Sequence, residues 1–525
     1  MKRITLIVFV LFALFFSCGD NSSRNIPGNL KCEHLVNPLG IDTETPRFTW
    51  QLIAESPGVE QKAFAISVGT DSVQISEGKG NVWESGVVYS TTIPAVYAGP
   101  ALQPFTRYYW CVKIQDNNGG WTKPSEVAIF ETGFMGKAGW KGHWITDTYD
   151  FNIKPAPYFR KEFEVQKKVK SARAYIAVGG LYELSLNGEK VGNHRLDPMY
   201  TRFDRRTLYV TYDVTPNLKE GKNAIGVLLG NGWYNHQSTA VWYFEKAPWR
   251  ARPKFCMDLR ITFDDGSEEI ISTDQNWKTA LSPIVFNSIY TAEHYDARLE
   301  LPGWNAPGFD DSKWKKSMNT GAPSQNITAQ ILHPIRNVKE IQAIKMTKFN
   351  DRNYVFDFGR NMAGVTKLNM KGAAGTTIHL KHGERLYENG HVDLSNIDVH
   401  YRPTDDTDPF QTDIVILSGN NDEFMPKFNY KGFQYVEVTS DKPVELSENS
   451  LVAYFMHSDV PPVGEISSSN ETLNKAWQAA NASYLSNLFG YPTDCPQREK
   501  NGWTGDAQIN IETGLYNFDA ITVYE

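Results

Sequence analysis

The 525-residue sequence is poor in cysteine, in runs of basic residues and in long apolar segments. Of its five cysteines, the four beyond Cys18 are scattered and form no C-x-x-C pair, so free buried thiols are expected for most of them rather than a zinc site or a dense disulfide framework. The net charge is −7 and no basic block occurs, which makes nucleic acid a poor partner. Beyond the first 16 residues, no apolar run is long enough to cross a membrane. What remains is a globular protein whose length predicts several domains.

The N-terminus has the pattern of an export signal. Lys2 and Arg3 precede an apolar run from 4 to 16, and Ser17 and Cys18 follow it. A small residue before a cysteine resembles the bacterial lipoprotein signal, which implies a signal peptide over 1–18 and a lipid on Cys18. An ordinary secretory peptide is the alternative. We therefore expect an exported lipoprotein, periplasmic or at the cell surface, with a polar tether over 19–30 that leads to the folded domains.

Most of the chain has the patterns of short β-strands. With 14 Trp and 25 Tyr the composition suits β-rich domains and sugar-binding surfaces alike. Over 31–135 the strong strand 107–115 is followed by the turn 116–120, and we expect a β-sandwich there. Its stretch 108–121 resembles fibronectin type III or Ig-like modules, which favours a structural role.

Residues 136–330 are predicted to form a second β-rich domain. Strands over 172–178 and 181–186 lead into the turn Asn187-Gly188. Together with the loop 230–234, they resemble jelly-roll carbohydrate-binding modules. Two interpretations of the loop stay open: its polar and aromatic residues contact a sugar, or its tryptophan fills the core. The residues concerned are Asn231, Trp233 and Tyr234.

Calcium is a further open expectation for this second domain, because several modules of this kind hold a structural or ligand-bridging ion. Asp197 and Asp204 supply oxygen donors in the same region. No spacing fixes a site, so no metal ligand is assigned.

A third β-sandwich is expected over 331–460, and the pattern changes at 461. After a proline-containing linker, Ser468 and Glu471 form a capping-box candidate. Apolar residues then recur every three or four positions and predict an amphipathic helix; they are Leu473, Trp477, Ala480, Tyr484 and Leu488. A second helix is predicted over 507–518. The fold class is therefore multidomain and mainly β, with tandem β-sandwich and jelly-roll domains before a helical segment.

Between the two predicted helices lies a loop, 491–508, that carries three carboxylates. They are Asp494, Glu499 and Asp506, with Arg498 and Trp503 between them. Prolines and glycines exclude one continuous helix. Carboxylates transfer protons and an indole face stacks on a sugar ring, so the loop points to carbohydrate chemistry.

The run 493–499 together with 502–507 resembles the signature of the α-L-rhamnosidases of glycoside hydrolase family 78. The segments 288–300 and 355–364 resemble two upstream segments of that family in the expected order. The resemblance implies that 461–525 begins an (α/α)6 barrel that acts with inversion of configuration. It implies Glu499 as the general acid and Asp494 and Asp506 as ligands of rhamnose hydroxyls. Trp503 and Arg498 would shape the pocket, and no catalytic metal or organic cofactor is expected.

The family's general base is a glutamate on a late barrel loop, and the sequence ends 26 residues after Glu499. We therefore expect this chain to be an N-terminal fragment or a truncation that is itself inactive. The leading hypothesis is a lipid-anchored, inverting α-L-rhamnosidase acting on rhamnose-containing carbohydrate. The alternatives are a non-catalytic surface carbohydrate-binding protein with a degenerate catalytic domain, or another (α/α)6 glycosidase or lyase.

Overall fold

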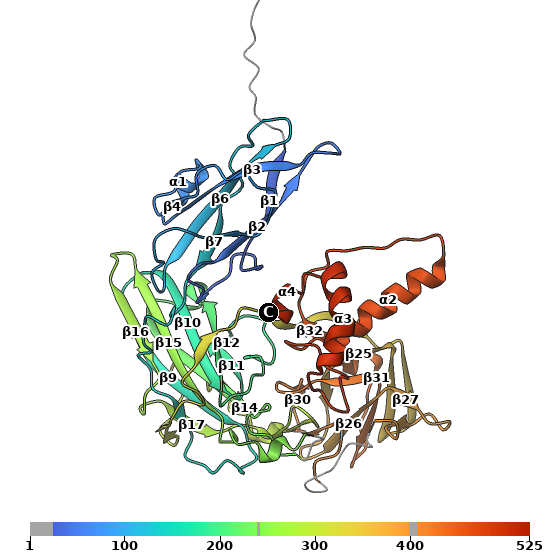
Figure 1. Ribbon diagram of the computed structural model, residues 1–525. Coiled ribbons are helices and arrows are strands. Elements are labelled where there is room, and N and C mark those ends of the chain that lie inside the picture. Colours follow the sequence, from blue (N-terminus) through green and yellow to red (C-terminus); the bar gives the residue numbers. More distant parts are fainter. Residues whose placement is uncertain (1–24, 239–241, 398–406) are drawn as a thin grey trace, which may run out of the picture. The chain divides into compact units, whose positions relative to one another are not determined.

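The computed structural model describes residues 25–238, 242–397 and 407–525 (Figure 1). The predicted signal peptide with Cys18 and the first half of the predicted tether, 19–24, lie outside these residues. The chain divides into two compact units, one formed mainly by 44–102 and 107–130 and the other by 131–525 with two short earlier segments. Cys32, Cys111, Cys256 and Cys495 are free and buried, as the sequence predicted. No helix in the described part of the chain is long and apolar enough to span a membrane.

The first unit is a β-sandwich of two sheets, as expected from the alternating strands. One sheet runs β1-β2-β5 and the other β4-β3-β6-β7. Phe48 packs on Trp110 in the core, with ring centroids 4.5 Å apart, and both side chains are fully buried. The strands are β1 (Ile26–Cys32), β2 (Arg47–Ile53), β3 (Gln61–Gly69), β4 (Trp83–Glu84), β5 (Ala95–Val96), β6 (Arg107–Asp116) and β7 (Ala128–Glu131), with the short helix α1 (Ser72–Ser76) after β3. Because β1 begins at Ile26, the end of the predicted tether is already in a strand.

The second unit begins with the jelly-roll sandwich, whose two sheets enclose a core that includes Phe159, Ile176 and Trp277. One sheet runs β21-β8-β15-β10-β13-β22, with β16 on β15, and the other runs β12-β11-β14-β9-β17-β20 (Figure 1). The strands are β8 (Ile145–Thr146), β9 (Pro157–Val165), β10 (Val169–Gly179), β11 (Leu181–Leu186), β12 (Glu189–Lys190), β13 (Thr207–Asp213), β14 (Gly221–Gly230), β15 (Lys254–Phe263), β16 (Glu268–Ser272), β17 (Lys278–Leu281), β20 (Lys315–Lys316), β21 (Met318–Asn319) and β22 (Ile327–Ala329). The 3-10 turns are η1 (Thr215–Asn217), η2 (Phe244–Lys246) and η3 (Ala297–Leu299).

A large sheet, here called the mixed sheet, follows in the order β18-β19-β29-β26-β31-β25-β32-β23, with β24 and β30 on β25. Its strands are β18 (Ile284–Asn287), β19 (Glu293–Asp296), β23 (Ile335–Gln342), β24 (Lys345–Asn350), β25 (Asn353–Lys371), β26 (Thr377–Gly383), β29 (Thr412–Ile416), β30 (Asn421–Phe424), β31 (Lys431–Ser440) and β32 (Leu451–Ser458), with the 3-10 turn η5 (Glu448–Ser450) before β32. A small ladder joins β27 (Arg385–Leu386) and β28 (Val392–Asp393). The strands β18 and β19 lie in sequence within the predicted jelly roll, yet they belong to this sheet.

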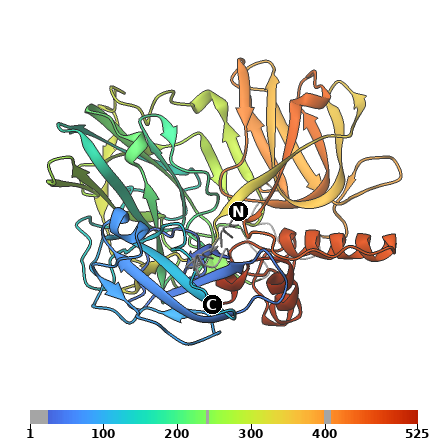
Figure 2. The same cartoon turned by 90° about the horizontal axis from the view of Figure 1, so that it is seen from above.

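The C-terminal segment is helical, with α2 (Glu471–Ser486), α3 (Thr504–Asn517) and α4 (Ile521–Tyr524). Asn470, not Ser468, caps α2, because its side chain accepts hydrogen bonds from the main-chain N–H of Thr472 and Leu473. The helix α2 lies against β25 and β32. Figure 2 shows the C-terminal helices in red next to the orange strands of this part of the chain. The observed class, mainly β with the start of a helical domain, confirms the predicted fold class.

Candidate active site

Residues 487–503, here called the acidic loop, connect α2 to α3 without regular secondary structure, whereas the last part of the predicted loop, 504–508, begins α3. Isolated β-bridges join Leu488 to Pro492 and Thr493 to Gly502. The Asp494 main-chain N–H donates to the Asn501 carbonyl at 3.1 Å. These contacts draw the two ends of the loop together, so the residues from 494 to 501 form a compact turn.

Glu499 is held by an aromatic residue of the same loop. The indole Nε1 of Trp503 donates to Glu499 Oε2 at 3.0 Å. The carboxyl group is half-buried and the indole is 42% exposed. The Trp503 ring in turn meets Trp242 edge to face, with centroids 5.0 Å apart. A hydrogen-bonded carboxyl group beside two indoles is an arrangement that can protonate a glycosidic oxygen and stack on a sugar ring.

Asp494 is the carboxylate that interacts with Glu499 electrostatically. Its Oδ1 accepts from the Asn501 N–H at 3.3 Å, and its Oδ2 accepts from Cys495 Sγ at 2.9 Å. Burial raises the pKa of Asp494, and the nearby charge of Glu499 raises it further. The charge of Glu499 therefore disfavours the ionised form of Asp494.

The other two residues singled out in the predicted loop have different surroundings. The main-chain carbonyl of Arg498 accepts a hydrogen bond from the Tyr290 hydroxyl at 2.6 Å. The Arg498 Nε is buried, and among the described residues it has no hydrogen-bond partner. Asp506 lies in the first turn of α3, where the helix dipole favours a negative charge. The structure thus brings Asp494, Glu499 and Trp503 together and places Arg498 and Asp506 on the same segment.

The candidate sugar-binding residues of the jelly roll are buried. Trp233 is 6% exposed and packs on Phe244 with ring centroids 4.9 Å apart. Tyr234 is 1% exposed, and Asn231 is 2% exposed and donates to the Asn287 carbonyl at 3.0 Å. These positions favour the interpretation that Trp233 fills the core.

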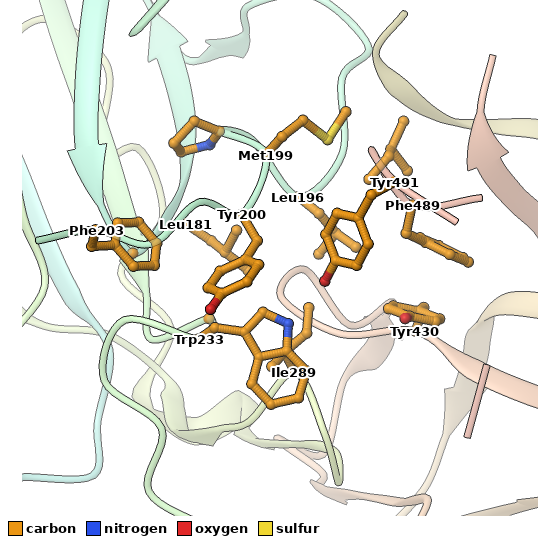
Figure 3. Close-up of a pocket in the computed structure, with 14 residues that line it drawn as sticks. Leu181, Leu196, Met199, Tyr200, Phe203, Trp233, Ile289, Tyr430, Phe489 and Tyr491 are labelled. Atoms are coloured by element: carbon orange, nitrogen blue, oxygen red, sulfur yellow. The ribbon is translucent and has the colours of Figure 1, made fainter. Parts of the chain in front are cut away.

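A small cavity beside Trp233 links this core to the start of the acidic loop. It is lined by aromatic side chains from three regions, including Tyr200, Tyr430 and Tyr491 (Figure 3). Its volume is about 30 Å³, the room of a single water molecule, so it cannot hold a sugar ring. Tyr430 stacks on Phe489 with centroids 3.6 Å apart, which fixes the end of α2 against the mixed sheet.

The two aspartates considered for calcium do not form a site together. Both carboxyl oxygens of Asp197 are occupied, Oδ2 by His194 at 2.7 Å and Oδ1 by Gln330 at 3.0 Å. Asp204 accepts from the Arg202 guanidinium at 2.9 Å. No group of three or more metal-binding side chains occurs among the described residues.

Sequence reasoning missed the neighbours of the loop that come from distant segments. Trp242 lies in the long β14–β15 connection, and Tyr290 lies between β18 and β19. The tryptophan carries no local signal that relates it to Glu499. Tyr290 belongs to the family-like segment 288–300, but that resemblance gave no contact for it.

Family models match four consecutive parts of the chain. They are the Rha78A-like N-terminal immunoglobulin domain over 27–136, the alpha-L-rhamnosidase N-terminal domain over 167–339, the concanavalin-like domain over 347–457 and the 6 hairpin glycosidase domain of bacterial alpha-L-rhamnosidases over 461–525. The acidic loop therefore falls within the segment that matches a glycosidase domain.

Among curated proteins, the chain is 32% identical to an alpha-L-rhamnosidase of Formosa agariphila, over 98% of the chain and 57% of that relative. It is 31% identical to one of an Alteromonas species, over 98% of the chain and 56% of the relative. The chain thus spans slightly more than half the length of these relatives.

Solved structures agree with these relationships. The alpha-L-rhamnosidase from Dictyoglumus thermophilum superposes with a TM-score of 0.88 at 37% identity, over 96% of this chain and 57% of that one. The Streptomyces avermitilis alpha-L-rhamnosidase complexed with L-rhamnose gives 0.88 at 25% identity, over 95% of this chain and 64% of that one. Taken with the domain matches, these similarities show that the chain belongs to the family of bacterial α-L-rhamnosidases, glycoside hydrolase family 78.

Proposed function

We propose that the protein is an inverting α-L-rhamnosidase that releases terminal, non-reducing α-L-rhamnose from glycosides or polysaccharides. The observation that supports this most directly is the carboxyl group of Glu499, which accepts a hydrogen bond from Trp503 and raises the pKa of Asp494, within the segment that matches a glycosidase domain. The choice of rhamnose as the sugar rests on relatives named alpha-L-rhamnosidase, one of which was solved in complex with L-rhamnose.

In the proposed reaction Glu499 gives its proton to the glycosidic oxygen as the bond from that oxygen to C1 breaks. A water molecule attacks C1 from the opposite face and loses a proton to a carboxylate general base. Asp494 and Asp506 accept hydrogen bonds from rhamnose hydroxyls, and Trp503 and Arg498 shape the pocket. No cofactor takes part in these steps.

We place the general base in a later barrel loop, in the part of the relatives that this chain does not match. Loss of a general base lowers the rate by on the order of 10²–10⁴-fold. A non-catalytic surface protein that binds carbohydrate is the alternative that the experiment below must distinguish.

The test uses the protein expressed from its complete reading frame and an alkyl α-L-rhamnoside, with the anomer of the released rhamnose followed by NMR. We expect β-L-rhamnose as the first product, and Glu499→Gln should lose about 10²–10⁴-fold in kcat. Glu512→Gln is the matched control, since Glu512 is an exposed carboxylate on α3. Sugar binding without turnover in the native protein would favour the non-catalytic alternative, and normal turnover by Glu499→Gln would remove its assigned role.

We further propose that the protein is exported and anchored through a lipid on Cys18, as the N-terminal pattern suggests. Expression in a bacterial host should give a membrane-associated protein, and Cys18→Ser should release it into the soluble fraction. Mass spectrometry of the mature N-terminus measures the lipid directly. An unmodified N-terminus at another position would indicate an ordinary secretory peptide.

A further inference from the structure

The turn between β18 and β19, residues 288–292, lies directly against the acidic loop. Tyr290 in this turn is fully buried, and its hydroxyl donates to the Arg498 carbonyl at 2.6 Å. This hydrogen bond joins the family-like segment 288–300 to the residue that precedes Glu499. The two residues are 208 positions apart in the sequence, so the contact exists only in the folded protein.

Lys500, the residue that follows Glu499, is held by the same turn. Its side chain is fully buried, and Nζ donates to the carbonyls of Ile289 at 2.9 Å, Tyr290 at 3.1 Å and Tyr430 at 2.5 Å. Three main-chain carbonyl oxygens therefore surround Nζ. Nζ also lies 4.5 Å from the centroid of the Tyr430 ring.

The burial of Lys500 costs folding free energy, because its side chain has no carboxylate partner among the described residues and its backbone is strained. In the part of the chain that the structure describes, no carboxylate lies within ion-pair distance of it, whereas the neighbouring buried Lys431 is paired with Asp413 at 2.8 Å. The backbone of Lys500 also has a φ of 53°, in the left-handed region that a lysine rarely adopts. Burial and the charge of Lys431 hold the pKa of Lys500 well below its usual range. A buried amine and a strained backbone persist only where the surrounding contacts fix them.

We propose that Tyr290 and Lys500 are positioning residues for Glu499. The 288–292 turn forms hydrogen bonds with the residue on each side of Glu499, through the Arg498 carbonyl and the Lys500 side chain. It thereby fixes the direction in which the acid's carboxyl group leaves an otherwise irregular loop. The inference rests on the proposed function in one respect, that Glu499 is the general acid.

A positioning role makes a prediction that a purely stabilising role does not. Proton donation matters most when the leaving group is a poor one, such as an alkyl alcohol or a sugar. A dinitrophenolate departs with little help from an acid. If the carboxyl group is misdirected, turnover of alkyl rhamnosides should fall far more than turnover of dinitrophenyl rhamnoside. General destabilisation would lower both rates alike.

The experiment compares these two substrates for Tyr290→Phe and Lys500→Met in the protein from the complete reading frame. We expect each variant to lose about tenfold more kcat on the alkyl rhamnoside than on the dinitrophenyl one. Lys500→Arg should restore part of the loss. Tyr354→Phe is the matched control, because the Tyr354 hydroxyl is equally buried and donates to the Val444 carbonyl at 2.7 Å, within the mixed sheet. Equal losses on both substrates would overturn the proposal.

A second readout needs no turnover and uses the 525-residue chain. Amide hydrogen exchange over 494–503 should be at least about tenfold faster in Tyr290→Phe than in the native chain, while Tyr354→Phe leaves that segment unchanged. Unchanged protection would overturn the proposal even if catalysis were altered. Full activity in Glu499→Gln, combined with loosened exchange in Tyr290→Phe, would instead show that the proposed acid is wrong while the turn does hold the loop.

Discussion

Glu293 is the buried carboxyl group whose ionisation bears most directly on stability. It begins β19, is 1% exposed and accepts hydrogen bonds from the main-chain N–H groups of Lys427 and Phe428. Burial raises the pKa of Glu293 to about 7, the charge of Asp413 adds to the shift, and Lys427 opposes it. The folded protein therefore binds a proton there that the unfolded chain releases at lower pH.

The sign of the resulting pH dependence follows from the raised pKa. Between about pH 4.5 and pH 7 the folded state holds the proton and the unfolded state does not. This group should therefore lower the free energy of unfolding by about 1.4 kcal/mol for each pH unit as the pH rises through that window. Urea unfolding at several pH values should show this fall in the native chain and a flatter profile in Glu293→Gln. Parallel profiles for the two proteins would contradict the assignment, and Glu512→Gln provides an exposed carboxyl control.

Metal removal should have little effect, because Asp197 is already saturated by protein donors. Besides His194 and Gln330, the Tyr212 hydroxyl donates to it at 3.0 Å. Treatment with EDTA followed by added calcium should shift Tm by less than about 1 °C, since a ligand stabilises a fold only where it binds. Differential scanning fluorimetry measures this, with magnesium as the matched control. A calcium-specific rise of several degrees would reveal a site that these residues do not explain.

At the residue scale, the sequence could indicate which side chains the loop carries but not what holds them. Asp494, Glu499 and Trp503 lie within ten residues of one another, so local spacing brings them together. Tyr290 and Trp242 reach the same loop from more than two hundred positions away. No local pattern encodes such a pairing, because it depends on how the jelly roll and the mixed sheet pack.

At the element scale, the helices show both the strength and the limit of periodicity. The stripe from Leu473 to Leu488 predicted α2, and its C-terminal members Tyr484 and Leu488 are buried. Leu473, near the N-terminal end of α2, is 58% exposed. Periodicity identifies the apolar face, whereas burial of that face depends on what packs against it.

The pairing of the strands was harder to predict from the sequence than the strands themselves. The jelly-roll boundary was predicted at 330, yet β18 and β19 pair within the mixed sheet, and β19 runs parallel to β29 with His294 opposite Ile414. The alternating pattern of a strand indicates which of its faces is buried, but not which distant strand it will pair with. The prediction followed the order of the sequence and therefore assigned the β18–β19 hairpin to the jelly roll, which surrounds it in the chain.

Gly432 in β31 tests how closely the mixed sheet supports the acidic loop. A Cβ at this position would lie 2.8 Å from Pro496 Cγ. Gly432→Ala should therefore push the loop away from the sheet and speed amide exchange over 494–503 by about tenfold, with a loss of stability of about 1–3 kcal/mol. Gly139→Ala is the control, since a Cβ there would have no atom within 4 Å and the backbone is unstrained. Unchanged exchange would mean that the contact between Gly432 and Pro496 does not hold the acidic loop in place.

At the scale of the whole molecule, the chain consists of two compact units that have separate cores. The first is closed around Phe48 and Trp110, and the second contains the clusters of the jelly roll, the mixed sheet and the helices. Domains with their own cores can unfold separately. The proposed active site lies in the second unit, so the stability of the first should not decide whether the acidic loop is formed.

Phe48→Ala tests this separation, since it removes a fully buried ring from the first core. Truncating a buried phenylalanine costs about 3–5 kcal/mol, so exchange protection should fall throughout β3 and β6. Protection in β10, β25 and the 494–503 loop should stay as in the native chain. Phe255→Ala, which removes an equally buried ring from the jelly-roll core, should give the opposite pattern. If Phe48→Ala loosened both units together, they would form one cooperative body and the first sandwich would contribute to holding the active site.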